Sequence, residues 1–300
     1  MKLTELIDNK ATISISTLSD DKALSRDIQG HLIRLGILDP AADGDFGPAS
    51  LFAGGEFIRL VSGGKTPTLD FNLAQQLVEA QAETLLPVAA GGKLAWAIWQ
   101  AMEHKKYWLA RVPGYVNIVY LEGAGTDGVP NDNKPNQFND VRTVITVQDG
   151  KPVIVGKWDG TTEPGKFYTQ NPMNPKGAAR IALDQFKAWV VGTHGAGAGA
   201  HEALVQHGTI RVFRDINKDY KRDGDAVDTG SSFAVDQHWG YDLPSLDIAN
   251  ASAGCLVGRT KAGHKQFMSM LKADPRFQNS RGYMFMTAVL SAQDIQPFLN

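Results

Sequence analysis

The sequence predicts an α+β protein of two domains, a small three-helix N-terminal module followed by a mostly β domain with a few helices. The chain has 300 residues, which is long for one average domain and suits two. Apolar residues recur at helical spacing in the first third, whereas β-branched and aromatic runs between glycine-rich turns dominate the remainder. We place the module at 1–85, a helical connector at 86–112 and the second domain at 113–300.

The composition narrows the possible partners and location. Hydrophobic residues make up 43% of the chain and charged residues 21%, as in an ordinary globular protein that can bury a core. A formal net charge of −2 argues against a nucleic-acid partner. No apolar signal-peptide region opens the sequence, and no apolar run is long enough to span a bilayer. We therefore expect synthesis in the cytoplasm without a signal peptide, and no membrane span.

Apolar spacing predicts the three helices of the module. The first contains residues 28–35, the second residues 52–60, and the third lies within 66–83. Thr68 or Asp70 can cap the third helix, because their side-chain oxygens accept hydrogen bonds from the unpaired amides of a first helical turn.

Between the first two helices, residues 39–50 read DPAADGDFGPAS, in which two glycines and a proline fix the loop around an aromatic residue. With the flanking helices, this loop resembles the peptidoglycan-binding domain of type 1 over about residues 20–80, except that Ala49-Ser50 stands where a threonine is usual. The resemblance implies that Asp43, Asp45 and Phe46 bind bacterial peptidoglycan. A three-helix bundle without affinity for the wall is the alternative.

The connector is expected to be helical through Trp99 and Met102 and to stop at Pro113. Trp99, Met102 and Tyr107 are expected to pack against the second domain rather than to bind sugar. In that domain, apolar runs between turn residues predict strands and two helices. The strands are expected within 115–123, 140–150, 151–160, 208–216 and 231–240, and the helices within 177–192 and 263–275.

Cys255 is the only cysteine, which excludes an intramolecular disulfide and a multi-cysteine zinc site. His238 precedes it by 17 positions and is a candidate general base, and Asp236 shares its strand face and could orient the imidazole. Gly254 permits a sharp turn, so that the amides of Gly254 and Cys255 could stabilise an oxyanion. A neighbouring imidazolium would lower the thiol pKa. The alternative is a small buried hydrophobic residue.

These residues resemble the signature of L,D-transpeptidase catalytic domains (the YkuD type). In chain order the resembling positions are His238, Ser252, Gly254, Cys255 and Arg259. Residues 161–168, TTEPGKFY, are similar to a Thr-x-Pro-Gly-x-Phe turn of the same family. The resemblance covers about residues 115–290. It implies a β-sandwich or barrel in which the cysteine attacks a diaminopimelate–D-alanine bond of a stem peptide and forms a thioester.

Two departures concern the details of the site. Ala253 stands where the family usually has histidine, and Arg259 lies further from the cysteine than usual. They leave the oxyanion donors and the acceptor, water or an amine, open. We expect Arg259 to bind a substrate carboxylate, and Ser252, Trp239 and His194 to contact the substrate.

Several functions follow from these features. A hydrolytic, lysin-type carboxypeptidase or endopeptidase (an endolysin or an enzyme exported by a non-Sec route) is favoured, because no secretion signal is visible. Formation or exchange of cross-links by an L,D-transpeptidase ranks second. A non-catalytic wall-binding or virion structural protein with an inert cysteine is the alternative from another class.

Metal sites are weakly indicated. Asp215, Asn217 and Asp219 alternate as in a calcium loop, but the glycine and the final glutamate of an EF-hand are missing, so a solvated loop over 214–230 beside the cleft is preferred. A calcium-stabilised adhesin-like module is a further alternative. His201 and His207 lack the spacing of a zinc-binding HExxH helix, and the glycine-alanine run before them is expected to form a flap over the site. No other cofactor is expected.

Overall fold

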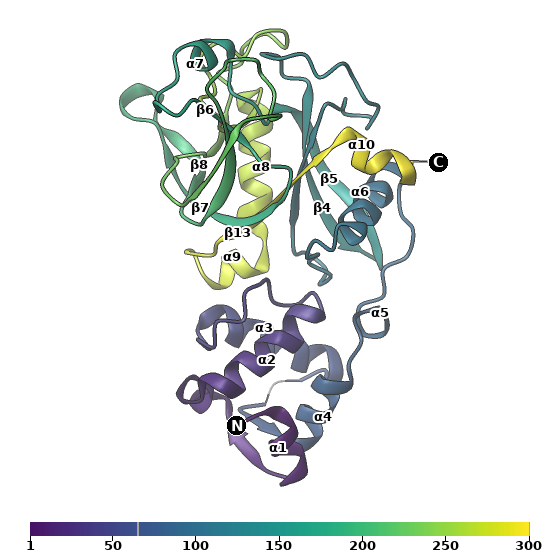
Figure 1. Cartoon of the computed structure of the whole chain (residues 1–300). Helices are drawn as coiled ribbons and strands as arrows, with labels where there is room; N and C mark the ends of the chain where they lie inside the picture. Colours follow the sequence, from purple (N-terminus) through teal and green to yellow (C-terminus); the bar gives the residue numbers. More distant parts are fainter. Residues whose placement is uncertain (65, 300) are drawn as a thin grey trace.

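Helices build the N-terminal lobe of the computed structural model, which describes residues 1–64 and 66–299, and a β barrel builds the second lobe. Figure 1 shows the helical lobe below the β-rich lobe, which carries α6 and α10 on one flank. The protein is therefore an α+β protein with two differently built parts.

The three helices predicted for the N-terminal lobe are confirmed as α2 (Lys22–Arg34), α3 (Pro48–Ser62) and α4 (Phe71–Glu79). Asp70 caps α4, where its side chain accepts the amide of Leu73 at 2.8 Å. Further elements complete the lobe without having been predicted. They are α1 (Leu3–Asp8), the 3-10 helix η1 (Ile15–Asp20), α5 (Ala82–Leu85) and the antiparallel pair β1 (Thr12–Ser14) and β2 (Thr68–Asp70).

The connector helix α6 (Lys93–His104) belongs to the β-rich lobe. Trp99 and Met102 are buried against the barrel, and Tyr107 is partly buried there, as the sequence predicts. The helix ends at His104, however, and not at Pro113. Lys106 adopts a left-handed φ of 58°, which a continuing α-helix does not allow.

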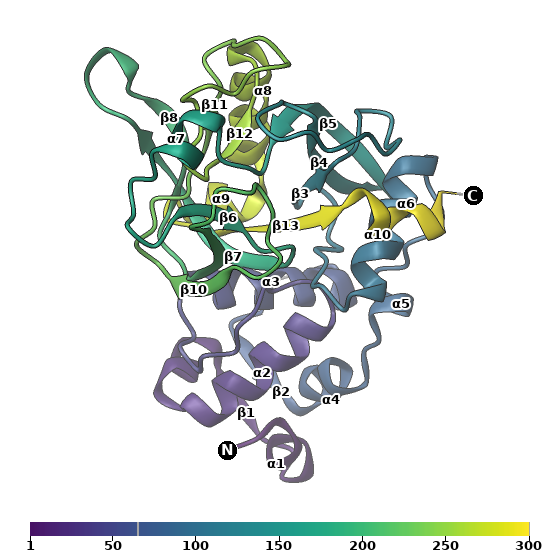
Figure 2. The same ribbon diagram turned by 45° about the horizontal axis from the view of Figure 1, so that its top comes forward.

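A closed barrel forms the centre of the second lobe, in the order β11-β12-β5-β4-β3-β13-β7-β8. Its strands are β3 (Asn117–Glu122), β4 (Asp140–Gln148), β5 (Lys151–Thr161), β7 (Gln185–His194), β8 (His201–Gln206), β11 (Gln237–Trp239), β12 (Leu256–Gly258) and β13 (Phe285–Ser291). Two adjacent pairs, β11 with β12 and β3 with β13, are parallel. Figure 2 shows β11 and β12 close to β8 and α8 (Lys261–Ala273).

Both faces of β3 are buried, because alternate residues enter two different hydrophobic cores. Ile118 and Tyr120 pack with Phe267 and Leu271 of α8, whereas Val119 joins the cluster formed with α6 and α10 (Ala292–Ile295). This explains why the strand is continuously apolar rather than alternating. The helix predicted within 263–275 is confirmed as α8.

The helix predicted within 177–192 is wrong. This segment forms β6 (Ala178–Ile181) and β7. β7 pairs with both β13 and β8, so barrel closure outweighs the helical propensity of the alanines. The expectation of a loop throughout 214–230 also needs correction, because β9 (Ile210–Asp215) and β10 (Ala226–Gly230) pair and, with β6, form a second, three-stranded sheet.

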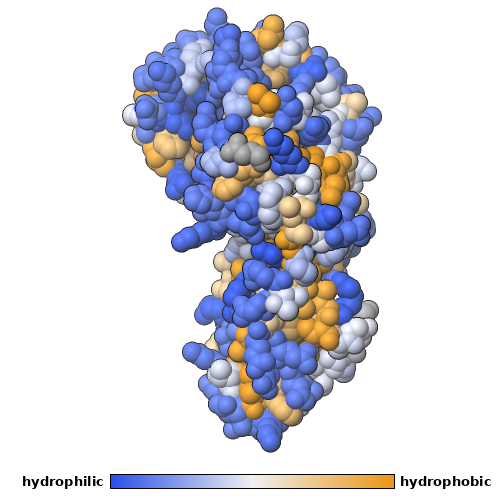
Figure 3. All heavy atoms as spheres, turned by 90° about the vertical axis from the view of Figure 1, so that its right-hand side faces the viewer, coloured by the Kyte–Doolittle hydropathy of each residue, from blue (hydrophilic) through white to orange (hydrophobic). Residues whose placement is uncertain are grey.

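On the face shown in Figure 3 most of the surface is hydrophilic, and hydrophobic residues gather on the lower, helical lobe and along the centre. No helix in 1–64 or 66–299 has both the length and the hydropathy that crossing a bilayer requires.

A buried carboxylate joins the two lobes. Asp39, after α2, accepts a hydrogen bond from the Tyr283 hydroxyl at 2.9 Å and forms an ion pair with Lys187 at 2.9 Å. Arg276 Nη1 lies 3.6 Å from the same carboxylate. Since these partners belong to the β-rich lobe, the contact fixes the helical lobe against it.

We predict that Asp39→Ala destabilises the protein by about 3 kcal/mol, because it leaves buried donors and a cation without their carboxylate. Chemical denaturation followed by circular dichroism measures the shift. Asp132→Ala is the matched control, because Asp132 pairs with Lys134 in an exposed position where an ion pair contributes little. Equal shifts for the two variants would contradict the role of Asp39.

Candidate active site

Parallel pairing of β11 with β12 brings the two ends of the predicted cysteine motif together. Gln237 lies opposite Leu256 and His238 opposite Val257. At the start of the pair, the Leu256 amide donates to the Asp236 carbonyl at 2.9 Å, and the Asp236 amide lies 3.4 Å from the Cys255 sulfur. The chain therefore returns Cys255 to Asp236, the residue before β11, and to the strand that carries His238.

His238 is held as a neutral imidazole. Its Nδ1 lies 2.8 Å from the Trp239 carbonyl, which can only accept, so Nδ1 carries the proton and Nε2 keeps a free lone pair. The residue is 1% exposed. Burial and the neighbouring His194 hold the pKa of His238 well below its usual value. A neutral imidazole with a free Nε2 is the form that a general base requires.

Asp236 does not orient His238 as expected. Its Oδ2 lies 2.8 Å from Nδ1 of His194, and its Oδ1 accepts the Gln206 amide at 2.9 Å. The His194 ring stacks on the His238 ring with centroids 3.9 Å apart and planes 6° apart. Asp236 therefore fixes His238 only indirectly, by positioning the imidazole that packs against it.

The residues expected to form a flap are the tip of the β7–β8 hairpin, which contains a short 3-10 turn, Gly197–Gly199. This hairpin carries His194 and His201. His201 Nδ1 donates to the Gly199 carbonyl at 2.8 Å, and its Nε2 accepts the Trp239 amide at 3.4 Å. The glycine-rich run thus positions two imidazoles next to His238.

Cys255 is closed off in this structure. It is 6% exposed and packs with Phe138, Ile248, Ala251 and Val257. Burial raises the pKa of the Cys255 thiol to about 12. The expected lowering of that pKa is therefore wrong for this conformation, because the neutral His238 supplies no positive charge and the thiol is dehydrated.

The turn before Cys255 requires glycine but offers fewer oxyanion donors than expected. Gly254 has φ of 126°, and a Cβ there would lie 2.4 Å from the Ala179 carbonyl. Its amide donates to Ser252 Oγ at 3.1 Å, and Ser252 Oγ donates to the Cys255 carbonyl at 3.0 Å. Ser252 thus stabilises the turn instead of facing a substrate. In the described part of the chain, the Cys255 amide makes no hydrogen bond and remains a possible donor.

A buried charge network lies next to this turn. Glu163 pairs with Arg180, and Glu122 binds Arg222 at 2.5 and 2.6 Å. Burial raises the pKa of Glu163 to about 7 and, with the nearby Glu122 carboxylate, that of Asp140 to about 8. These buried charged residues were not predicted from the sequence, although charges at the ends of apolar strands are a visible signal.

Residues 161–168, TTEPGKFY, which resemble the Thr-x-Pro-Gly-x-Phe turn, pack on the turn that precedes Cys255. The Gly165 amide donates to the Ser252 carbonyl at 2.9 Å, and a Cβ at Gly165 would lie 2.3 Å from the Ala249 carbonyl. The two segments on which the family resemblance rests therefore meet in space.

Arg259 is already engaged. Its guanidinium lies 3.4 Å from the Asp159 carboxylate and 3.5 Å from the Leu243 carbonyl, and its amide donates to the Asp159 carbonyl. It anchors β12 to β5, so it is not the unpaired cation that the predicted carboxylate clamp requires.

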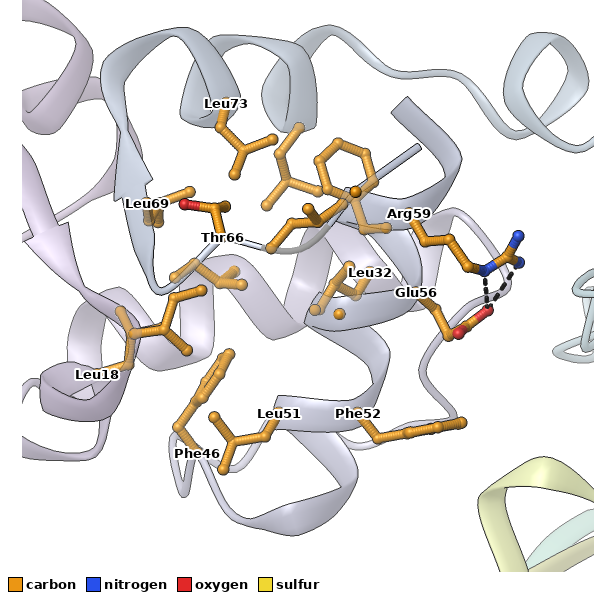
Figure 4. A pocket seen from close by; sticks show the side chains of 18 of the residues that line it. Leu18, Leu32, Phe46, Leu51, Phe52, Glu56, Arg59, Thr66, Leu69 and Leu73 are labelled. Carbon is orange, nitrogen blue, oxygen red and sulfur yellow. Dashed lines mark hydrogen bonds and ion pairs between the residues drawn. The ribbon is translucent and has the colours of Figure 1, made fainter. Parts of the chain in front are cut away.

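Of the three expected wall-binding residues, Asp43 stabilises its own loop and Phe46 lines a cavity. Asp43 accepts hydrogen bonds from the Gln29 side chain and the Asp45 amide, each at 2.9 Å. Phe46 is 5% exposed and lines an apolar cavity of about 570 Å³ in the helical lobe, shown in Figure 4. Leu51 is exposed at this cavity, and Glu56 and Arg59 pair with each other beside it.

Side chains of the acidic segment 215–220 bind groups within that segment. Both carboxylate oxygens of Asp215 accept amides, from Asp219 and Tyr220, at 3.1 Å, and Asn217 donates to Asp219. Among residues 1–64 and 66–299, no group of three His, Cys, Asp or Glu side chains is arranged to hold a metal ion.

No protein-family model and no curated protein matches this chain. A solved structure from Clostridium acetobutylicum, described as a fused Zn-dependent amidase/peptidase/peptidoglycan-binding domain-containing protein, is similar at 10% identity and a TM-score of 0.30. The similarity covers 93% of this chain and 99% of that one. A likeness at this level carries no argument about fold or activity.

We predict that Cys255 in the free protein reacts with iodoacetamide about a thousandfold more slowly than free cysteine at pH 8, because a pKa of about 12 leaves little thiolate. The rate should rise about tenfold per pH unit up to pH 9, since each unit raises the thiolate fraction tenfold. Mass spectrometry of the labelled protein measures it, with the urea-unfolded protein as control. A rate matching that of free cysteine would show that the thiol is open.

Proposed function

We propose that the protein is a cysteine acyl-transfer enzyme that acts on peptidoglycan stem peptides, with hydrolysis as its reaction. The observation that carries the proposal is the parallel pairing of β11 and β12, which brings Cys255 beside the strand of a buried His238 whose Nε2 is free. The peptidoglycan substrate comes from the sequence resemblances of the two lobes.

In the proposed acylation, the thiol proton of Cys255 moves to Nε2 of His238 as the sulfur bonds to the carbonyl carbon of the peptide. The amide of Cys255 donates to the developing oxyanion. The imidazolium of His238 then protonates the leaving amine, the C–N bond breaks and a thioester remains. His194, held by Asp236, keeps the His238 ring in place during both proton transfers.

In the proposed deacylation, His238 removes a proton from water, whose oxygen attacks the thioester carbonyl. The C–S bond breaks, the sulfur regains a proton from His238, and the peptide leaves as a carboxylate. An amine in place of water would give a cross-link, which is the second outcome of the same acyl-enzyme.

Reaction requires the sulfur to become accessible. Ile248 and Ala251, which cover it, belong to the segment 240–254. In this segment Tyr241, Asp242 and Ala249 have φ of 58°, 57° and 50°. Left-handed φ values cost tyrosine and alanine about 1–2 kcal/mol each, whereas aspartate adopts them more readily, so the closed loop contains two strained residues. We propose that substrate binding moves this loop.

The helical lobe is proposed to bind the wall. Its cavity is lined mainly by leucine, isoleucine and phenylalanine side chains, so it suits the methyl groups of a peptide better than a sugar (Figure 4). Tethering of the barrel to an insoluble polymer would raise the local substrate concentration.

A specific observation supports a second candidate, a non-catalytic wall-binding or virion structural protein. The sulfur of Cys255 lies in a closed hydrophobic cluster and its pKa is raised, as expected of an inert core cysteine. In that case the imidazole cluster would serve only to pack the barrel end.

We predict that the purified protein cleaves stem peptides of isolated sacculi and that Cys255→Ala lowers the rate by at least about a thousandfold, because the nucleophile is lost. His238→Gln should lower it by about a hundredfold or more through loss of the base. Mass spectrometry of muropeptides distinguishes loss of a terminal D-alanine, opening of cross-links and formation of new ones.

Lys151→Met is the control, because Lys151 is exposed at the end of β5 remote from β12. Unchanged muropeptides with the folded wild-type protein would favour the non-catalytic candidate. Undiminished cleavage by Cys255→Ala would refute the cysteine mechanism.

A further inference from the structure

A second cavity, of about 170 Å³, lies beside the imidazole cluster at the start of α8. Its polar lining comprises His201, Glu202, Trp239, Lys261, His264 and Lys265. His201 and Trp239 belong to both this cavity and the candidate site. The His201 ring centroid is 5.9 Å from that of His238, and Trp239 follows His238 in the chain. A group bound here would therefore be adjacent to the proposed base.

The cavity has an unbalanced positive charge. Lys261 and Lys265 are one helical turn apart on α8, and neither has a carboxylate within 4 Å in the described chain. Lys261 Nζ lies 4.8 Å from the centroid of the Trp239 ring, a cation–π contact that fixes its position. Glu202 cannot neutralise the lysines, because Lys272 Nζ contacts both of its oxygens at 2.9 Å.

The remaining polar groups leave the charge of the cavity positive. Asp242, the other nearby acid, accepts the backbone amide of Lys261 at 2.8 Å and offsets at most one of the two lysine charges. His264 donates through Nε2 to the Glu202 carbonyl, and both ring nitrogens of His201 are engaged, Nδ1 with the Gly199 carbonyl and Nε2 with the Trp239 amide. Trp239 Nε1 is buried and has no acceptor among the described residues.

We propose that this cavity is a subsite for a carboxylate of the substrate, which Lys261 and Lys265 bind. The inference rests on the proposed function, because a stem peptide that contains diaminopimelate has a free side-chain carboxylate close to the bond that is cut. A volume of about 170 Å³ is ample for such a small group. The two lysines thereby take the role that Arg259, paired with Asp159, cannot fill.

The test compares two synthetic stem peptides that differ only in this group, a carboxylate in one and a carboxamide in the other. Calorimetry on the full-length Cys255→Ala protein should give at least about tenfold tighter binding of the carboxylate peptide, as expected for a charge-assisted contact. Lys261→Met, placed in the same protein, should weaken binding of that peptide to the level of the carboxamide and leave the carboxamide unaffected. Lys265→Met should act in the same direction, and Lys261→Arg should retain much of the preference.

Lys151→Met again serves as the control for loss of one positive charge. Equal binding of the two peptides, or equal weakening of both by Lys261→Met, would overturn the inference. kcat/KM of the wild-type protein separates the two proposals. Turnover without any preference for the carboxylate refutes the subsite alone, whereas selective binding without turnover refutes the proposed reaction alone.

Discussion

The parallel pairing of β11 with β12 is the constraint on which the candidate site depends. Both strands are short, and each is held by a second neighbour, β8 on one side and β5 on the other. Because side chains alternate along a strand, a slip of one residue would turn Cys255 or His238 to the opposite face. The pairing of β11 with β8 and of β12 with β5 prevents such a slip. The register of the sheet therefore determines the geometry of the site.

Parallel neighbours need a crossover, and here the crossover has a second consequence. Residues 240–255 connect the two strands without a helix and fold back over the cysteine at their own end. The same contacts that hide the sulfur dehydrate it, and dehydration raises its pKa. Displacement of the loop would therefore expose the thiol and lower its pKa at once. Exposure and ionisation of the thiol are thus coupled through the segment 240–255.

The spacing of apolar residues predicted the helices and strands that depend mainly on neighbouring residues in the sequence. The three helices of the N-terminal lobe, α8 and the strands β3 to β5 follow from apolar spacing, and the return of Cys255 to the strand of His238 follows from loop length. The segment 177–192 was misassigned, because only the pairing of β7 with two partners distinguishes it from a helix. The partner of Asp236 was likewise unpredictable, since His194 reaches it from a hairpin 42 positions earlier.

The buried charges explain why the small sheet matters to the site. Arg222, in a segment expected to be solvated, enters the protein and binds Glu122 at the end of β3, while Arg180 on β6 pairs with Glu163. Ala179, next to Arg180, is the residue against which Gly254 packs. Removal of one buried charge would leave its partner uncompensated, a large cost for groups so far from water. The segment 216–225 therefore supports the cysteine turn, and it connects β9 and β10 of the three-stranded sheet, which is separate from the barrel.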